Sequence, residues 1–89
     1  MRTVFRKSFT KDLRNYSKDR SLLSRIEAII LQVESADTIT DITNLKKLKA
    51  EGSYYRIRIG NFRLGLIIEN ETVTFVRLLH RKDIYRYFP

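Results

Sequence analysis

Three arginines are spaced so that a single β-hairpin would place them on the same face of a sheet. Arg56 and Arg58 precede the pair Gly60-Asn61, and Arg63 follows it, within a stretch rich in Tyr, Ile, Phe and Leu. A Gly-Asn pair suits the positive φ values of a two-residue hairpin turn. Because strand side chains alternate between faces, this turn would bring the three guanidinium groups together.

The register of this predicted hairpin follows from the turn. Its pairs are Tyr55 with Leu66, Arg56 with Gly65, Ile57 with Leu64, Arg58 with Arg63 and Ile59 with Phe62. Like charges that stand directly opposite each other destabilise a sheet by up to about 1 kcal/mol. An anionic ligand would turn that cost into binding energy, and arginine can donate two parallel hydrogen bonds to a phosphate. The alternative is an ordinary solvated polar face, which most antiparallel sheets have.

The composition indicates a polyanionic partner and excludes several classes of protein. The 89 residues include 18 Lys and Arg against 10 Asp and Glu, a net charge of +8, which favours nucleic acid or an acidic protein as partner. The absence of cysteine excludes disulfides and thiolate metal sites, and one histidine cannot supply a zinc cluster. We therefore expect a cytoplasmic protein without a metal or cofactor. No apolar run approaches the ~18 residues of a membrane span.

The N-terminal half predicts one strand followed by two helices. Residues 2–6 alternate weakly and predict a strand, after which Ser8 could cap a first helix. The apolar stripe of this helix would be Phe9, Leu13 and Tyr16. Asp19 or Ser21 could cap a second helix that runs to about Ser35. Its buried face would consist of Leu22, Leu23, Ile26, Ile29, Ile30 and Val33.

The connector from 36 to 52 carries an apolar residue at every third position over part of its length. These residues are Ile39, Ile42, Leu45 and Leu48. The spacing predicts one or two helical turns pinned to the core. In that arrangement Lys46, Lys47 and Lys49 would point outward as a basic surface.

The C-terminal third completes the order β-α-α-β-β-β. A turn at 69–71 leads to a last antiparallel strand from Thr72 to about Leu79, and residues 81–89 are too few for a free helix but could dock as one or two turns. We predict an α+β fold in a single domain, 1–89, with a helical hairpin packed on one face of an antiparallel sheet and a short C-terminal helical segment. The other face of the sheet would be open and basic.

Three motifs together resemble the RelE/ParE superfamily of type II toxins. They are Leu45-Lys-Lys-Leu-Lys, Tyr55-Arg-Ile-Arg-Ile-Gly-Asn-Phe-Arg-Leu and Val76-Arg-Leu-Leu-His-Arg-Lys-Asp-Ile-Tyr, and the resemblance covers essentially the whole chain in element order. It implies a small toxin that is silenced by an antitoxin encoded beside it. In the RelE-like branch it implies an endoribonuclease that cuts mRNA, commonly in the ribosomal A site. In the ParE-like branch it implies a poison of DNA gyrase.

The resemblance also implies a set of catalytic residues. By position these are Arg56 and Arg58, Arg63 on the following strand, Arg81 after the last strand, and Tyr85 or alternatively Tyr87 in the C-terminal segment. Several RelE relatives carry lysine at the positions of Arg56 and Arg58, and lysine can lose its proton where arginine effectively cannot. The identity of the general base is therefore open.

RNA cleavage without a metal requires the 2′-hydroxyl to lose a proton and attack the adjacent phosphorus while negative charge grows on the phosphate oxygens. Arg63 and Arg81 would hold the scissile phosphate, and Arg56 and Arg58 would grip it or its neighbour. Additional RNA contacts would come from Lys46, Lys47, Lys49 and Arg77.

Proton transfer would fall to His80 or Tyr85. Histidine changes charge near neutral pH, and the anionic form of a tyrosine is favoured among arginines. In a regular last strand His80 and Arg81 would point to opposite faces. A two-residue turn at 70–71 would place His80 on the arginine face, whereas a turn one residue longer would place Arg77 and Arg81 there, as the resemblance favours.

Three functions are compatible with these features. The first is an mRNA endonuclease that acts on the ribosome, which arginines converging on one sheet face favour. The second is a ParE-like inhibitor of DNA gyrase, and the third is an RNA-binding or ribosome-binding relative with weak catalysis. In each case we expect a cognate antitoxin that supplies an acidic or amphipathic helix, either covering the basic side or displacing the C-terminal segment.

Overall fold

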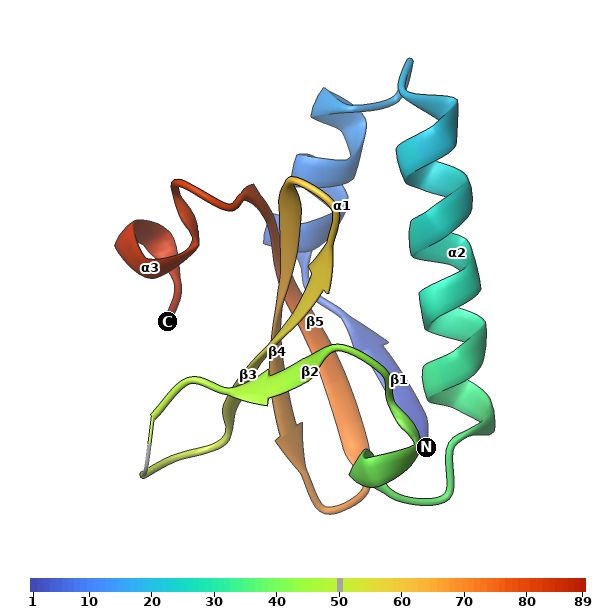
Figure 1. Cartoon of the computed structure of the whole chain (residues 1–89), viewed down its shortest axis with the longest axis vertical. Helices are drawn as coiled ribbons and strands as arrows, with labels where there is room; N and C mark the ends of the chain where they lie inside the picture. Colours follow the sequence, from blue (N-terminus) through green and yellow to red (C-terminus); the bar gives the residue numbers. More distant parts are fainter. Residues whose placement is uncertain (50) are drawn as a thin grey trace.

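The computed structural model describes residues 1–49 and 51–89 and shows an α+β fold, as the sequence predicts (Figure 1). The elements are β1 (Arg2–Phe5), α1 (Lys7–Asn15), α2 (Arg20–Ser35), the 3₁₀ turn η1 (Ile39–Asp41), β2 (Leu45–Lys47), β3 (Tyr54–Ile59), β4 (Phe62–Glu69), β5 (Thr72–His80) and α3 (Ile84–Tyr87). The strands form one sheet in the order β1-β5-β4-β3-β2. Strand β1 runs parallel to β5, and the other neighbours are antiparallel.

The β3–β4 hairpin confirms the predicted turn and register. Gly60 has φ +59°, and Ile59 pairs with Phe62. Arg58 stands opposite Arg63, and Arg56 stands opposite Gly65. The arginines therefore share one face of the sheet, because every second residue of each strand points to the same side.

The two long helices confirm one predicted cap and correct the other. The side chain of Asp19 accepts a hydrogen bond of 3.1 Å from the backbone N–H of Leu22 and so caps α2. Ser8 does not cap α1, which begins at Lys7. The Ser8 hydroxyl instead donates to the backbone oxygen of Val76 at 2.6 Å, so it ties α1 to β5.

The connector before the hairpin is only partly helical, which corrects the sequence prediction. Ile39–Asp41 does form a single 3₁₀ turn, but Leu45–Lys47 is strand β2 at the edge of the sheet. Asn44, at φ +61°, redirects the chain into this strand. Pairing with the free edge of β3 decides the conformation there and overrides the apolar spacing. Ala50, which belongs to the same predicted segment, lies outside the described residues.

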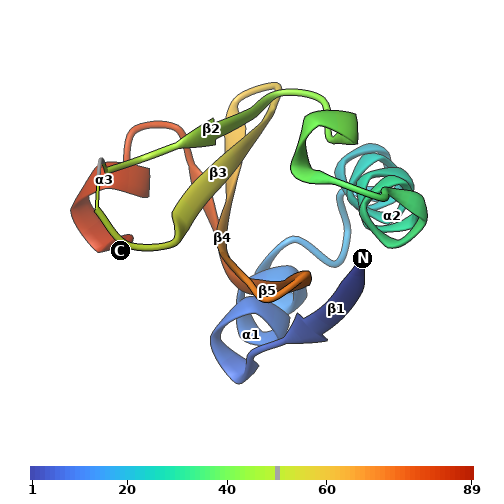
Figure 2. The same cartoon turned by 90° about the horizontal axis from the view of Figure 1, so that it is seen from below.

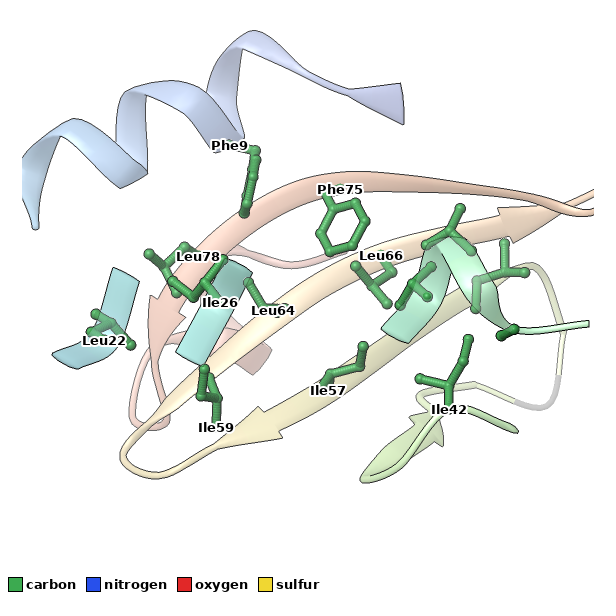
Figure 3. Close-up of a cluster of buried hydrophobic side chains, with 14 residues drawn as sticks. Phe9, Leu22, Ile26, Ile42, Ile57, Ile59, Leu64, Leu66, Phe75 and Leu78 are labelled. Atoms are coloured by element: carbon green, nitrogen blue, oxygen red, sulfur yellow. The ribbon is translucent and has the colours of Figure 1, made fainter. Parts of the chain in front are cut away.

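The main core lies between the sheet and the helices α1 and α2 (Figure 3). The predicted helix stripes face it: Phe9 and Val33 are fully buried, and Ile26 is nearly so. The sheet contributes Leu64 and Phe75, which are also fully buried. Helix α3 lies on the opposite side of the sheet from α2 (Figure 2), where a second apolar cluster forms. The predicted open basic face is thus wrong in part, because α3 covers some of it.

Candidate functional site

The arginines of the hairpin lie close enough to act on one another electrostatically. The pKa of Arg63 is lowered first by partial burial of its guanidinium and then by the positive charges of Arg56 and Arg58. Arg81 also lowers the pKa of Arg63, whereas the hydroxyl of Tyr85 acts in the opposite direction. Five of the predicted site residues therefore lie close enough to influence one another's charge around Arg63. They are Arg56, Arg58, Arg63, Arg81 and Tyr85.

Two of these guanidinium groups, those of Arg63 and Arg56, donate to backbone oxygens rather than to acids. Arg63 donates from Nη1 to the oxygens of Gly60 (2.9 Å) and Phe62 (2.8 Å), which folds its side chain back over the hairpin turn. Arg56 donates from Nη1 to the oxygen of Asn44 at 2.8 Å, while its buried Nε has no hydrogen-bond partner. Arg58 is exposed. A carbonyl oxygen orients a guanidinium without cancelling its charge.

Among the described residues a single ion pair is present, and it lies outside this cluster. Asp12 of α1 accepts from Arg77 Nε at 2.8 Å and from Arg77 Nη2 at 3.3 Å. The Arg77 charge is therefore engaged by an acid of the same chain. That contact ties Arg77, which by register lies opposite Gly65, to α1; the RNA contact of Arg77 stays a prediction.

A β-bulge decides which residues of β5 join the arginine face. The turn at Asn70 and Glu71 has two residues with positive φ, so a regular strand would have brought His80 to that face. The register instead slips between Gly65 and Leu66, and the extra residue on β5 is Val76. Because of this slip, each residue of β5 after Val76 points to the opposite side of the sheet from the one that regular alternation would give it.

His80 therefore lies on the helix side of the sheet, as in the second of the two arrangements that the sequence left open, the one that the resemblance favours. It pairs with Phe62 and packs its ring edge against that residue, with centroids 5.7 Å apart. Its Nδ1 accepts a hydrogen bond from the backbone N–H of Lys82 at 3.2 Å. Arg81 follows the strand and donates its backbone N–H to Asn61 at 2.8 Å, next to the hairpin turn.

The two candidate tyrosines have different surroundings. Tyr85 is 69% exposed and raises the pKa of Arg63. The ring of Tyr87 instead lies 5.4 Å from the guanidinium carbon of Arg86, a cation–π contact outside the cluster.

The three predicted lysines divide between the two faces. Lys46 pairs with Arg56 across β2 and β3 and so extends the arginine face by one strand. Lys47 pairs with Tyr55 and points to the helix side. Lys49 is exposed beyond the end of β2.

Sequence reasoning missed three residues that shape this region. Asp12 follows the spacing of the apolar stripe of α1, and an acid at such a position signals a buried partner. Gly65 lies inside a strand, where glycine often marks a close approach of another group. That group is the ring of Phe88, for which the sequence carries no comparable signal.

The sequence matches known toxins over nearly its whole length. Residues 3–85 fit the family model described as the ParE toxin of the type II toxin–antitoxin system parDE. Over 90 aligned positions, which cover all of both chains, it is 40% identical to a protein named toxin RelE3 from Methanocaldococcus jannaschii. A type II toxin is thus the class that fold and sequence define. The chain belongs to the RelE/ParE superfamily of type II toxin–antitoxin toxins.

Solved structures agree with this assignment. A chain of the RelB–RelE antitoxin–toxin complex from Methanococcus jannaschii matches with a TM-score of 0.80 and 38% identity, covering 97% of this chain and 99% of that one. The YoeB dimer from Staphylococcus aureus (TM-score 0.71, 13% identity, 91% and 97% covered) and YafQ from E. coli (0.66, 13%, 96% and 99%) share the fold alone. Within the described residues, no helix is long and apolar enough to cross a membrane.

Proposed function

We propose that this toxin is an endoribonuclease that cleaves mRNA on the ribosome by metal-independent attack of the 2′-hydroxyl. The observation that carries the proposal is the field at Arg63: three other arginines lower the pKa of this residue, and among the described residues no carboxylate lies within 4.0 Å of them. This accumulation of positive charge is unfavourable in the free protein. A phosphodiester is the ligand that would relieve it.

The arrangement suggests a division of roles during cleavage. Arg63 and Arg81 hold the scissile phosphate and stabilise the charge that grows on its oxygens, while Arg56 and Arg58 bind the same phosphate or its neighbour. As the 2′-oxygen bonds to phosphorus, the bond from phosphorus to the 5′-oxygen breaks, which leaves a 2′,3′-cyclic phosphate and a 5′-hydroxyl. Removing one preorganised donor of this kind costs about 10²- to 10³-fold in rate.

Tyr85 is the candidate for proton transfer that remains on this side of the sheet. Tyr85 is 69% exposed and raises the pKa of Arg63, whereas the imidazole of His80 lies across the sheet. Tyr85 could equally stack on a base of the RNA. Lys46, beside Arg56, would strengthen binding through a further phosphate.

The proposal includes an antitoxin as the partner that silences this cytoplasmic toxin. The matched structure from Methanococcus jannaschii is itself an antitoxin–toxin complex. An acidic or amphipathic helix from such a partner would neutralise the arginine face. Co-expression with a small acidic protein encoded beside this gene should therefore yield a complex and restore growth.

Inhibition of DNA gyrase is the second candidate, because the matching family model is described as the ParE toxin. Two assays on cells that express the toxin separate the nuclease from the gyrase inhibitor. Primer extension detects cuts in mRNA, and a parallel assay scores gyrase-linked DNA breaks. For the nuclease, Arg63→Ala and Arg81→Ala abolish the mRNA cuts, while Arg20→Ala, an equal charge loss on the exposed start of α2, leaves them. DNA breaks without mRNA cuts would support gyrase inhibition, and neither would indicate passive binding. The downstream fragment of the cut mRNA should carry a 5′-hydroxyl, the product of attack by the 2′-hydroxyl, and a 5′-phosphate would instead indicate metal-activated water.

A further inference from the structure

The C-terminal segment is fixed to the sheet by two apolar side chains. Ile84 is fully buried and Phe88 is 3% exposed, and both pack with Leu79 in the second apolar cluster. The ring of Phe88 also meets that of Tyr54 edge-on, with centroids 5.8 Å apart. We call Ile84 and Phe88 the C-terminal latch.

Gly65 of β4 makes the seat for this latch. A Cβ built on Gly65 would lie 2.8 Å from two ring carbons of Phe88, a distance that real Cβ contacts do not show. The backbone at Gly65 is ordinary strand, since the positive φ values among the glycines belong to Gly52 and Gly60. Space for the ring of Phe88 is therefore the physical reason for a glycine at this position.

Between the two latch residues lies Tyr85, which directly follows Ile84; Ile84 packs with Leu79, and Leu79 is the residue of β5 that pairs with Arg63. Helix α3 has only four residues, Ile84–Tyr87, and a helix of that length does not persist by itself in water. Phe88 closes it by donating its N–H to the oxygen of Ile84 at 2.9 Å. The position of Tyr85 thus depends on the latch rather than on helix propensity.

We propose that Phe88, seated on Gly65, is a positioning residue that holds Tyr85 beside Arg63. The inference rests on the proposed function for its catalytic consequence, but the position of Tyr85 can be measured without any RNA. Releasing the latch would leave the arginines in place, because they belong to β3 and β4 and to the residue that follows β5. The effect is therefore expected on the catalytic step more than on RNA binding.

The first test uses the NMR signal of the Arg63 Nε–Hε group in the purified toxin. Tyr85→Phe provides the reference shift for loss of the hydroxyl. Phe88→Ala should move the Arg63 signal in the same direction, and so should Gly65→Ala, which displaces the ring without removing it. Tyr87→Ala, which removes an exposed aromatic residue of the same helix, is the matched control and should leave the signal in place. An unchanged signal in both Phe88→Ala and Gly65→Ala would overturn the proposal.

The second test measures cleavage on mRNA-programmed ribosomes. Phe88→Ala should lower kcat by the factor that Tyr85→Phe gives, on the order of 10²-fold for a lost proton-transfer group, with a smaller change in KM. Phe88→Leu should restore part of this loss. In the Phe88→Ala background, Gly65→Ala should cost nothing further, because the clash that it creates is with the missing ring.

The outcomes separate this proposal from the proposed function. If no variant, including the unchanged toxin, cuts RNA but the Arg63 signal responds as described, the latch stands and the nuclease proposal fails. If RNA is cut and Phe88→Ala loses activity while Tyr85→Phe does not, Phe88 does not act through Tyr85. If the activity losses of Gly65→Ala and Phe88→Ala simply add in the double variant, the contact between Phe88 and Gly65 is not what positions Tyr85. Far-UV circular dichroism establishes that each variant is folded.

Discussion

Replacing Asp12 is the sharpest test of how α1 is held to strand β5. Asp12 is 7% exposed, and its carboxylate accepts three hydrogen bonds, two from Arg77 (2.8 and 3.3 Å) and one from the backbone N–H of Leu78 (2.9 Å). Ser8, four residues earlier on the same helix, donates to the oxygen of Val76. Strand β1 pairs with β5 only as far as Phe75, so the backbone groups of Val76 and Leu78 at this edge have no strand partner, and α1 satisfies them.

The size of the effect follows from what Asp12→Ala leaves behind. Removing one partner of a buried ion pair costs about 3–5 kcal/mol, and we expect the lower end, ~3 kcal/mol, because the Arg77 side chain is 28% exposed and water can reach it. The unpaired N–H of Leu78 falls within this figure. At about 4–8 °C per kcal/mol for a domain of 60–100 residues, Tm should fall by ~12–24 °C.

Urea unfolding followed by circular dichroism measures this loss. Glu27→Ala, which removes an exposed carboxylate from α2, is the matched control and should stay within about 0.5 kcal/mol of the unchanged protein. The double variant Asp12→Leu with Arg77→Leu should recover most of the loss, since a buried pair can be exchanged for apolar residues at little cost. A loss below about 1 kcal/mol for Asp12→Ala would refute this account of the contacts between α1 and β5.

Three further predictions concern the site itself. Arg63→Gln should raise Tm or leave it unchanged, while cleavage falls about 10²- to 10³-fold. The lowered pKa of Arg63 means that the folded state disfavours its charged form, and this penalty to folding acts at every pH below that pKa. A clear fall in Tm would contradict it. His80→Gln should leave the rate and pH profile of cleavage unchanged, since the His80 ring packs on Phe62. If one limb of the pH–rate profile disappears in this variant, His80 takes part in catalysis. Lys46→Ala should reduce the slope of log K against log salt for RNA by about 0.7 and Lys47→Ala by less, because Lys46 alone of the pair lies on the arginine face; equal reductions would refute this division.

The parts of the fold that the sequence predicted correctly depend on local rules. The hairpin register follows from the backbone demands of Gly60-Asn61 and the two-residue period on either side. Strand β2 was missed because three residues, Leu45–Lys47, have no strand stability of their own and adopt that conformation by pairing with the edge of β3. The same spacing of apolar residues would suit a helical turn in isolation.

The cover over the arginine face was missed for a related reason. The prediction that residues 81–89 dock as a helical turn was correct, but the sequence did not indicate the surface on which they dock. That choice depends on the fit between Phe88 and Gly65, which lie 23 positions apart in the sequence and meet only in the folded chain. Glycine in a strand indicates that something approaches, without indicating what.

The assignment of His80 and Arg81 to faces shows most clearly where counting along a strand fails. The turn at 70–71 has two residues, the case that was predicted to bring His80 to the arginines. One extra residue, Val76, moves His80 to the other face, and no local sequence pattern in β5 indicates this bulge. The backbone on either side of the bulge makes hydrogen bonds to Ser8 and Asp12, more than 60 residues earlier in the chain. The side of the sheet that His80 takes is thus set by one inserted residue rather than by the length of the turn.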